Sequence, residues 1–219
     1  MLALQNLLMA TRHRAASIFI TFGLGATNLN VENVTNTAMT LNINVGDCVI
    51  CFGSCSSSGI STGCTDNGAS GGNTYTALGS IDVGGDLMFG YICLSATKTA
   101  TSITVAHCYN HAGCTLLNVG SVGASQFTQT GDTLGGPQSA SLTTTGTNSM
   151  LFGYVMETQS GSVFTAVTGT ILESASNGLP SAFLNYQASA SGTPVTLETT
   201  VLPATIGEWG MCVVELIPI

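Results

Sequence analysis

Apolar and polar residues alternate strictly along residues 39–45, which read Met-Thr-Leu-Asn-Ile-Asn-Val. Successive side chains of a β-strand point to opposite sides, so this alternation is typical of a strand with one face against a core. The pattern predicts a strand over residues 39–45 that buries Leu41, Ile43 and Val45. The next apolar run, residues 48–52, is continuous, which predicts a strand covered on both faces.

Apolar runs of strand length continue to the end of the chain, and they end at Gly, Ser, Asn or Pro. They are rich in β-branched and aromatic residues, and no helical period of useful length is present. We therefore predict an all-β protein in which two antiparallel sheets pack as a sandwich. The further strands are expected at residues 17–22, 75–78, 87–94, 102–106, 139–144, 150–156, 162–167, 182–186, 195–199 and 209–216. The further core residues are expected to be Ile50, Phe52, Phe152, Phe164, Trp209, Val213 and Leu216. Residues 53–74 are interpreted as a long loop.

The first 16 residues differ from the rest of the chain. Leu4, Leu7 and Leu8 fall at helical spacing, but so short a helix is not stable by itself in water. Arg12 and Arg14 follow them and supply two of the three cationic side chains. We therefore divide the chain into an N-terminal arm, residues 1–16, and one β-sandwich domain, residues 17–219. An alternative is that residues 12–26 belong to a processed signal peptide.

Charge is scarce along the whole chain. Charged residues make up 6% of the sequence, against about 25% in an ordinary soluble protein. With 31 Thr and 22 Ser, the surface is expected to be rich in hydroxyl groups. A net charge of -8 with only three Lys and Arg residues argues against a nucleic-acid partner. No apolar stretch reaches the roughly 20 residues that span a bilayer, so no membrane partner is expected.

Eight cysteines in a chain of low charge indicate a disulfide framework, as in proteins of oxidising environments. Cys55 and Cys64 bracket a Ser- and Gly-rich segment, and Cys108 and Cys114 bracket a shorter one. We expect one or both of these local pairs to be oxidised. The other four cysteines lie inside apolar runs and are expected to act as small buried apolar residues; they are Cys48, Cys51, Cys93 and Cys212.

A metal site is the alternative for part of this set. His107, Cys108, His111 and Cys114 fall within eight residues and carry the nitrogen and sulfur ligands of tetrahedral zinc. The paired spacing of a zinc ribbon is absent, however. Cys48 and Cys51 do not add to such a site, because strand alternation points them to opposite faces. We therefore expect no zinc.

Two further patterns bear on catalysis and calcium binding. Residues 59–63 match the nucleophile elbow of serine hydrolases, which requires a sharp turn from a strand into a helix. No helix is expected after them. Asp66 with Asn67, and Asp82 with Asp86, fall short of the six to eight oxygens that calcium takes, so turn roles are expected instead. We expect no catalytic residue, no metal site and no cofactor.

Several short segments carry a family resemblance. They are residues 72–76, residues 143–145 with Asn148, and residues 151–153, 161–166 and 209–214. At these segments the chain resembles the largely uncharacterised, jelly-roll-like β-sandwich modules of phage virion proteins and bacterial surface proteins. The resemblance implies a fold and a location on a particle or outside the cytoplasm, and it implies no reaction.

The function expected from these observations is structural. Sheet edges are normally protected by Lys, Pro or a covering segment, and the β region contains one Lys, so neighbouring subunits are expected to cover the edges. We predict a non-catalytic virion protein, either a capsid decoration (cement) protein or a fibre subunit. It is expected to form a homo-oligomer or to bind a major capsid or fibre protein at the virion surface, with residues 1–16 in the contact. The alternative is a secreted cell-surface or filament subunit, or an adhesin module that binds a cell-surface glycan.

Overall fold

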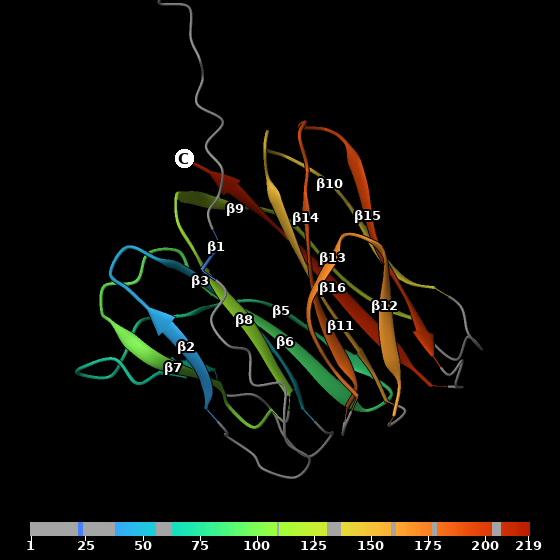
Figure 1. The fold of residues 1–219 in the computed structure, drawn as a ribbon, viewed down its shortest axis with the longest axis horizontal. Helices are drawn as coiled ribbons and strands as arrows, with labels where there is room; N and C mark the ends of the chain where they lie inside the picture. Colours follow the sequence, from blue (N-terminus) through green and yellow to red (C-terminus); the bar gives the residue numbers. More distant parts are fainter. Residues whose placement is uncertain are drawn as a thin grey trace, which may run out of the picture.

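The structure is a computed structural model, and it describes residues 22–23, 38–55, 63–108, 110–130, 137–158, 161–176, 179–202 and 207–219. These residues form antiparallel β-strands and no helix, so the all-β prediction is confirmed (Figure 1). The N-terminal arm and nearly all of the strand expected at residues 17–22 lie outside the described residues. The boundary between arm and domain therefore stays an expectation.

The described residues form two successive sets of eight strands. The first set is β1 (Phe22–Gly23), β2 (Met39–Ile43), β3 (Cys48–Cys55), β4 (Cys64–Asp66), β5 (Thr76–Val83), β6 (Asp86–Cys93), β7 (Ala100–Val105) and β8 (Asn110–Leu116). The second set is β9 (Val119–Thr130), β10 (Gln138–Thr143), β11 (Met150–Glu157), β12 (Val163–Thr168), β13 (Thr170–Ala175), β14 (Ser181–Gln187), β15 (Pro194–Leu202) and β16 (Trp209–Pro218).

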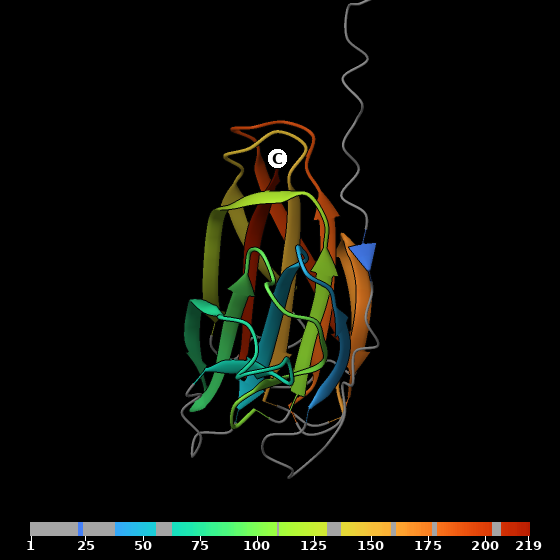
Figure 2. The same ribbon diagram turned by 90° about the vertical axis from the view of Figure 1, so that its left-hand side faces the viewer.

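Hydrogen bonds divide these strands into four sheets rather than the two that we expected. The first inner sheet has the order β1-β8-β3-β6-β5, and the second inner sheet has the order β13-β14-β11-β16-β9. The first outer sheet is β2-β7-β4, and the second outer sheet is β10-β15-β12. In Figure 1, β2 and β7 of the first outer sheet lie at the left, β12 and β15 of the second outer sheet lie at the right, and β6, β11 and β16 of the inner sheets lie between them; Figure 2 is turned so that β2 and β7 face the viewer.

Three apolar cores separate the four layers. The central core lies between the two inner sheets, and each inner sheet also packs against its own outer sheet across an outer core. Strand alternation explains why β3 is buried along its whole length. Cys48, Ile50 and Phe52 enter the central core, whereas Val49 and Cys51 enter the first outer core. Both faces of β3, β8 and β11 are covered, so these three inner strands are buried along their whole length.

The second set of strands repeats the topology of the first. Adding eight to each strand number converts β1-β8-β3-β6-β5 into β9-β16-β11-β14-β13, and β2-β7-β4 into β10-β15-β12; both are observed sheets. Local details repeat as well. A residue with positive φ precedes β3 at Gly46 (93°) and β11 at Asn148 (54°). The two sets share this strand order, although the residues of equivalent strands such as β3 and β11 differ.

Most of the expected strands and core positions are confirmed. Leu41 and Ile43 are buried with Met39, while Thr40 and Asn42 between them are exposed. Val45 is a wrong prediction, because β2 ends at Ile43 and Val45 is 65% exposed in the following turn. The other expected core residues are all buried. Four strands were missed, namely β4, β8, β9 and β13, and the expected loop at 53–74 contains the end of β3 and all of β4.

Candidate functional site

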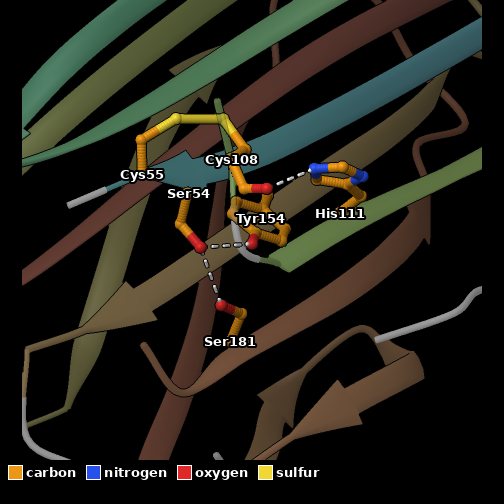
Figure 3. The surroundings of a disulfide bond; sticks show 6 residues. All are labelled: Ser54, Cys55, Cys108, His111, Tyr154 and Ser181. Carbon is orange, nitrogen blue, oxygen red and sulfur yellow. Dashed lines mark hydrogen bonds between the residues drawn. A yellow bond between two sulfur atoms is a disulfide. The ribbon is translucent and has the colours of Figure 1, made fainter. Parts of the chain in front are cut away.

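The disulfide of the described residues links Cys55 to Cys108, so the expected pairs Cys55–Cys64 and Cys108–Cys114 are wrong (Figure 3). The reason is the path of the strands. Cys55 ends β3 on the face of the first outer core, and the turn after β7 brings Cys108 to the same place. Cys114 lies on β8 and points into the central core instead. Cys64 lies on β4, next to Cys51.

Gly53 provides the space that this disulfide occupies. A Cβ atom at position 53 would lie 2.8 Å from Cys108 Sγ and 3.0 Å from Val105 Cβ, which are contacts that real side chains do not make. Because every second residue of β3 faces the outer core, the residue between Phe52 and Ser54 must be small. The strand therefore needs glycine here for packing rather than for a special backbone angle.

The residues considered for zinc are not brought together. Cys108 is oxidised, and Cys114 lies in a different core. His111 is buried on β8 and its Nε2 atom lies 2.8 Å from the carbonyl oxygen of Cys108 (Figure 3). Within the described ranges, no group of three or more His, Cys, Asp or Glu side chains is placed to hold a metal ion. His107 has a positive φ of 64° in the turn that leads to the disulfide.

The cysteines expected to be apolar core residues are buried and have free thiols: Cys48, Cys51, Cys93 and Cys212. Burial raises the pKa of the Cys48 thiol to about 12, with smaller contributions from Cys93 and Asp47. Burial also raises the pKa of Cys114 and of Cys212. Thiolate is the reactive form of cysteine, so the thiols of Cys48, Cys114 and Cys212 are poor nucleophiles at neutral pH.

A cluster of hydroxyl groups lies at one end of the central core. Ser54 Oγ is 3.1 Å from the hydroxyl of Tyr154 and 3.4 Å from Ser181 Oγ (Figure 3). The side chain of Asn110 donates to the carbonyl oxygen of Leu179 in the same region. Burial raises the pKa of Tyr154 to about 12, although hydrogen bonds with Ser181 and Ser54 oppose the shift. Sequence reasoning missed this cluster, because its members come from four strands and the segment before β14.

A second polar cluster holds the segment between β4 and β5. Asp66 accepts hydrogen bonds from the backbone amides of Gly68 (2.9 Å) and Asn73 (3.2 Å), from Asn73 Nδ2 (2.8 Å) and from the hydroxyl of Tyr75 (2.7 Å). Asn73 Oδ1 in turn accepts from the amides of Thr97 (2.8 Å) and Lys98 (2.9 Å). The motif at residues 72–76 is therefore a structural clamp between two turns. The expected turn role of Asp66 is confirmed.

The neighbouring candidates for calcium binding have similar roles. Asn67 Oδ1 accepts from the amides of Thr101 (2.8 Å) and Ser102 (3.0 Å). Asp82 Oδ1 accepts from the amide of Gly85 (2.8 Å) in the turn between β5 and β6. Side-chain oxygens of Asp66, Asn67 and Asp82 thus accept hydrogen bonds from backbone amides of this chain.

Glu215 on β16 is the most enclosed carboxylate of the described residues. It is fully buried and accepts hydrogen bonds from the amides of Ala124 (2.9 Å), Thr145 (2.9 Å) and Gly146 (3.0 Å), and from the hydroxyl of Thr145 (2.8 Å). Burial by itself would raise the pKa of this carboxyl group, but the hydrogen bonds outweigh it and lower the pKa to about 2. Glu215 therefore holds the turn before β11 in place as an anion.

The surface of the second outer sheet is apolar along one edge. Val163, Val167 and Leu202 are 52%, 55% and 62% exposed, and Val163 pairs with Leu202 across β12 and β15. Elsewhere on this outer face the hydroxyl oxygens of Ser141 and Thr196 lie 2.6 Å apart. β12 is an edge strand of its sheet. We call Val163, Val167 and Leu202 the apolar strip.

Three depressions on the described surface contain no carboxylate, imidazole, Lys or Arg side chain. One of them is lined by Thr170, Asn185, Tyr186 and Gln187, together with Met150 and Gly169. Ser61 of the hydrolase pattern and the arm residues Leu4, Leu7, Leu8, Arg12 and Arg14 lie outside the described residues. In the part of the chain that the structure describes, no helix is long and apolar enough to cross a membrane.

Comparisons with known proteins give no match: no family model, no curated protein and no solved structure is significantly similar to this chain.

Proposed function

We propose that this protein is a non-catalytic structural subunit of a virion, either a capsid decoration protein or a fibre subunit, which works by assembling with copies of itself at the virion surface. The observation that carries the proposal is the apolar strip on an unprotected edge. Hydrophobic patches at a surface mark contacts with other molecules. Because β12 also offers the unpaired side of its backbone, a neighbouring subunit can cover both features at once.

The topology of each half supports the same class of protein. The first strand of each set pairs with the eighth, the second with the seventh and the third with the sixth. This nested pairing is the order of a jelly roll, a fold that occurs in viral capsid proteins and in lectins. We infer that the chain contains two jelly-roll-like units joined through their inner sheets. Fold alone does not assign a function, so the proposal rests on the surface features of the second outer sheet.

The edges of all four sheets support assembly rather than a free monomer. None of the eight edge strands in the described residues contains Lys or Pro, the residues that commonly protect an edge. The carboxylates and thiols with the most altered pKa values serve as turn clamps or lie closed in cores. These observations favour a structural role over catalysis.

Self-association can be tested by exchanging the apolar strip for charge. We expect Val163→Asp combined with Leu202→Asp to weaken oligomer formation at least about 10-fold, as measured by light scattering over a range of concentrations. Val45→Asp is the matched control, because Val45 is equally exposed and lies on the other side of the molecule. A full-length protein that stays monomeric at high concentration would contradict the proposal.

The arm can be tested separately. Arg12 and Arg14 can gain charge complementarity on an acidic neighbour, and the chain carries eleven carboxylates. Deleting residues 2–14 is expected to leave the β-sandwich folded and to abolish incorporation into the particle. Normal assembly of the shortened protein would show that the arm makes no such contact.

A glycan-binding adhesin is the second candidate. The depression lined by Asn185, Tyr186 and Gln187 offers amide groups and an aromatic ring without charge, which is a lining suited to a neutral sugar. A glycan array tests this alternative directly. Binding that is lost on Asn185→Ala and kept on Val163→Asp would favour it over assembly.

A further inference from the structure

Cys51 and Cys64 lie side by side in the first outer core, with their Sγ atoms 3.1 Å apart. Cys51 lies on β3 of the first inner sheet, and Cys64 begins β4 of the first outer sheet. The separation of the two sulfur atoms exceeds a disulfide bond length of about 2.05 Å by roughly 1 Å. A small approach of the two sheets is therefore enough to bring the sulfur atoms to bonding distance.

The existing disulfide has the same arrangement. Cys51 and Cys55 are four residues apart on β3 and face the same core, as strand alternation requires. The cysteines opposite them, Cys64 and Cys108, both lie next to Val105. Cys64 is the register partner of Val105, and the amide of Cys108 donates to the Val105 carbonyl oxygen at 3.3 Å. Cys51 with Cys64 thus forms a second connection from β3 to the same place.

We propose that Cys51 and Cys64 form a second disulfide when the protein matures under oxidising conditions, parallel to Cys55–Cys108. The proposal concerns a covalent modification and does not depend on the proposed assembly function. It differs from the pairing expected from spacing, because the bond would start at Cys51 and enclose Cys55 within its ring. The two disulfides together would tie the inner sheet to both β4 and the end of β7.

The oxidant can be a small disulfide such as oxidised glutathione. Cys64, the more exposed of the two, loses its proton, and the thiolate attacks the small disulfide to give a mixed disulfide and one released thiolate. Cys51 then loses its proton and attacks the Cys64 sulfur, which releases the second thiolate. Two protein thiols are oxidised to one disulfide, and one small disulfide is reduced to two thiols.

The folded core opposes this reaction once it has closed. Burial and the contact with Cys51 raise the pKa of Cys64, so little thiolate is present in the folded protein. The bond is therefore expected to form while the first outer core is still open during folding. Protein that folds in a reducing medium is expected to keep both thiols, and to oxidise slowly afterwards.

Peptide mapping tests the pairing. The protein is unfolded, refolded with a mixture of reduced and oxidised glutathione, alkylated and digested without reduction. Chymotrypsin cuts after Phe52 and thermolysin cuts before Ile60, so Cys51, Cys55 and Cys64 fall on separate peptides. We expect a peptide that links Cys51 to Cys64 and, under denaturing conditions, four free thiols rather than six. Alkylation of both Cys51 and Cys64 overturns the proposal, and so does a peptide that links Cys55 to Cys64.

Stability gives an independent measurement. Folding with glutathione instead of a reducing medium also closes Cys55–Cys108, so the rise in the midpoint of thermal unfolding between the two media is compared in two proteins. We expect this rise to be roughly 5–10 °C larger in the native chain than in the variant Cys51→Ala combined with Cys64→Ala, which keeps only Cys55–Cys108. Cys51→Ala combined with Cys64→Ala should abolish the linked peptide and leave four free thiols after refolding with glutathione, since only Cys55–Cys108 is then oxidised. Cys48→Ala is the control, because it removes a buried thiol from the central core and should leave the Cys51–Cys64 peptide in place. Loss of that peptide in the control would also contradict the proposal.

Discussion

Phe52 and Tyr154 stack on each other in the central core, with ring centroids 5.6 Å apart and ring planes 5° from parallel. They belong to equivalent strands of the two halves, β3 and β11, and each lies six residues after the turn residue with positive φ. Equivalent positions of the two halves therefore contact each other in the central core.

Substitution of this pair should weaken the whole molecule. Phe52→Ala removes a fully buried ring from the contact between the halves, and we expect it to lower the free energy of unfolding by about 3–5 kcal/mol. Tyr154→Phe keeps the stacking and removes the hydrogen bond to Ser54, so a loss of about 1 kcal/mol is expected. Urea denaturation measures both values. Equal effects of the two substitutions would contradict the dominant role of the stacked rings.

The two halves should fail to fold separately. Fragments 1–117 and 118–219 would each expose one side of the central core, including Phe52 and Met88 on one fragment and Phe152 and Phe183 on the other. We expect each fragment to aggregate or remain unfolded by itself, and a mixture refolded together to give a soluble complex of one copy of each. Circular dichroism and gel filtration measure this result. A stable monomeric fragment would show that a half is an independent domain.

Glu215 should make stability depend on pH in acid. Its folded pKa of about 2 lies below its ordinary value of 4.5, so the anion stabilises the fold above about pH 4.5. This contribution is lost as the pH falls from 4.5 through 2, because the folded form then takes up the proton as well. We expect the stability difference between the native protein and Glu215→Gln to shrink over this range. Glu198→Gln is the control on the outer face, and a pH-independent difference at Glu215 would contradict the prediction.

Gly72 should tolerate alanine less well than another glycine of similar conformation. Gly72 and Gly192 have φ values of 75° and 72°, so both substitutions strain the backbone by about 1–2 kcal/mol. At Gly72 the new Cβ would also lie 2.5 Å from Asp66 Oδ1, whereas nothing lies within 4 Å at Gly192. We expect Gly72→Ala to lower the midpoint of thermal unfolding by several degrees more than Gly192→Ala. Equal shifts in the two midpoints would mean that Asp66 can move away from the new Cβ atom without lowering stability.

Alternation along single strands was enough to predict much of the fold. It placed Leu41 and Ile43 on one face, and it separated Cys48 from Cys51. It failed for β8, because His111, Gly113 and Cys114 occur among small residues and were interpreted as part of a short loop closed by a disulfide. The number of sheets was not predictable either. A continuous apolar strand indicates that both faces are covered, but it does not indicate which sheets cover them.

The pairing of Cys55 with Cys108 could not be predicted from the spacing of cysteines along the chain. Cys55 and Cys108 are 53 residues apart in sequence, and they meet only because β7 returns beside β3. Local spacing favoured Cys64 as the partner of Cys55, since nearby cysteines are the simplest pair to join. Glu215 carried no distinguishing signal in the sequence, because most of its hydrogen-bond donors are backbone amides from distant segments. The role of residues 1–16 in the assembly contact stays a prediction.

The four-layer arrangement also separates the two outer surfaces of the molecule from each other. Three sheet spacings of roughly 10 Å place the first and second outer sheets about 30 Å apart. Residues of one outer face, such as Thr40, share no core with residues of the other, such as Val163. A substitution on one outer face is therefore separated from the opposite outer face by both inner sheets. Each face can change its sequence without direct contact with the other.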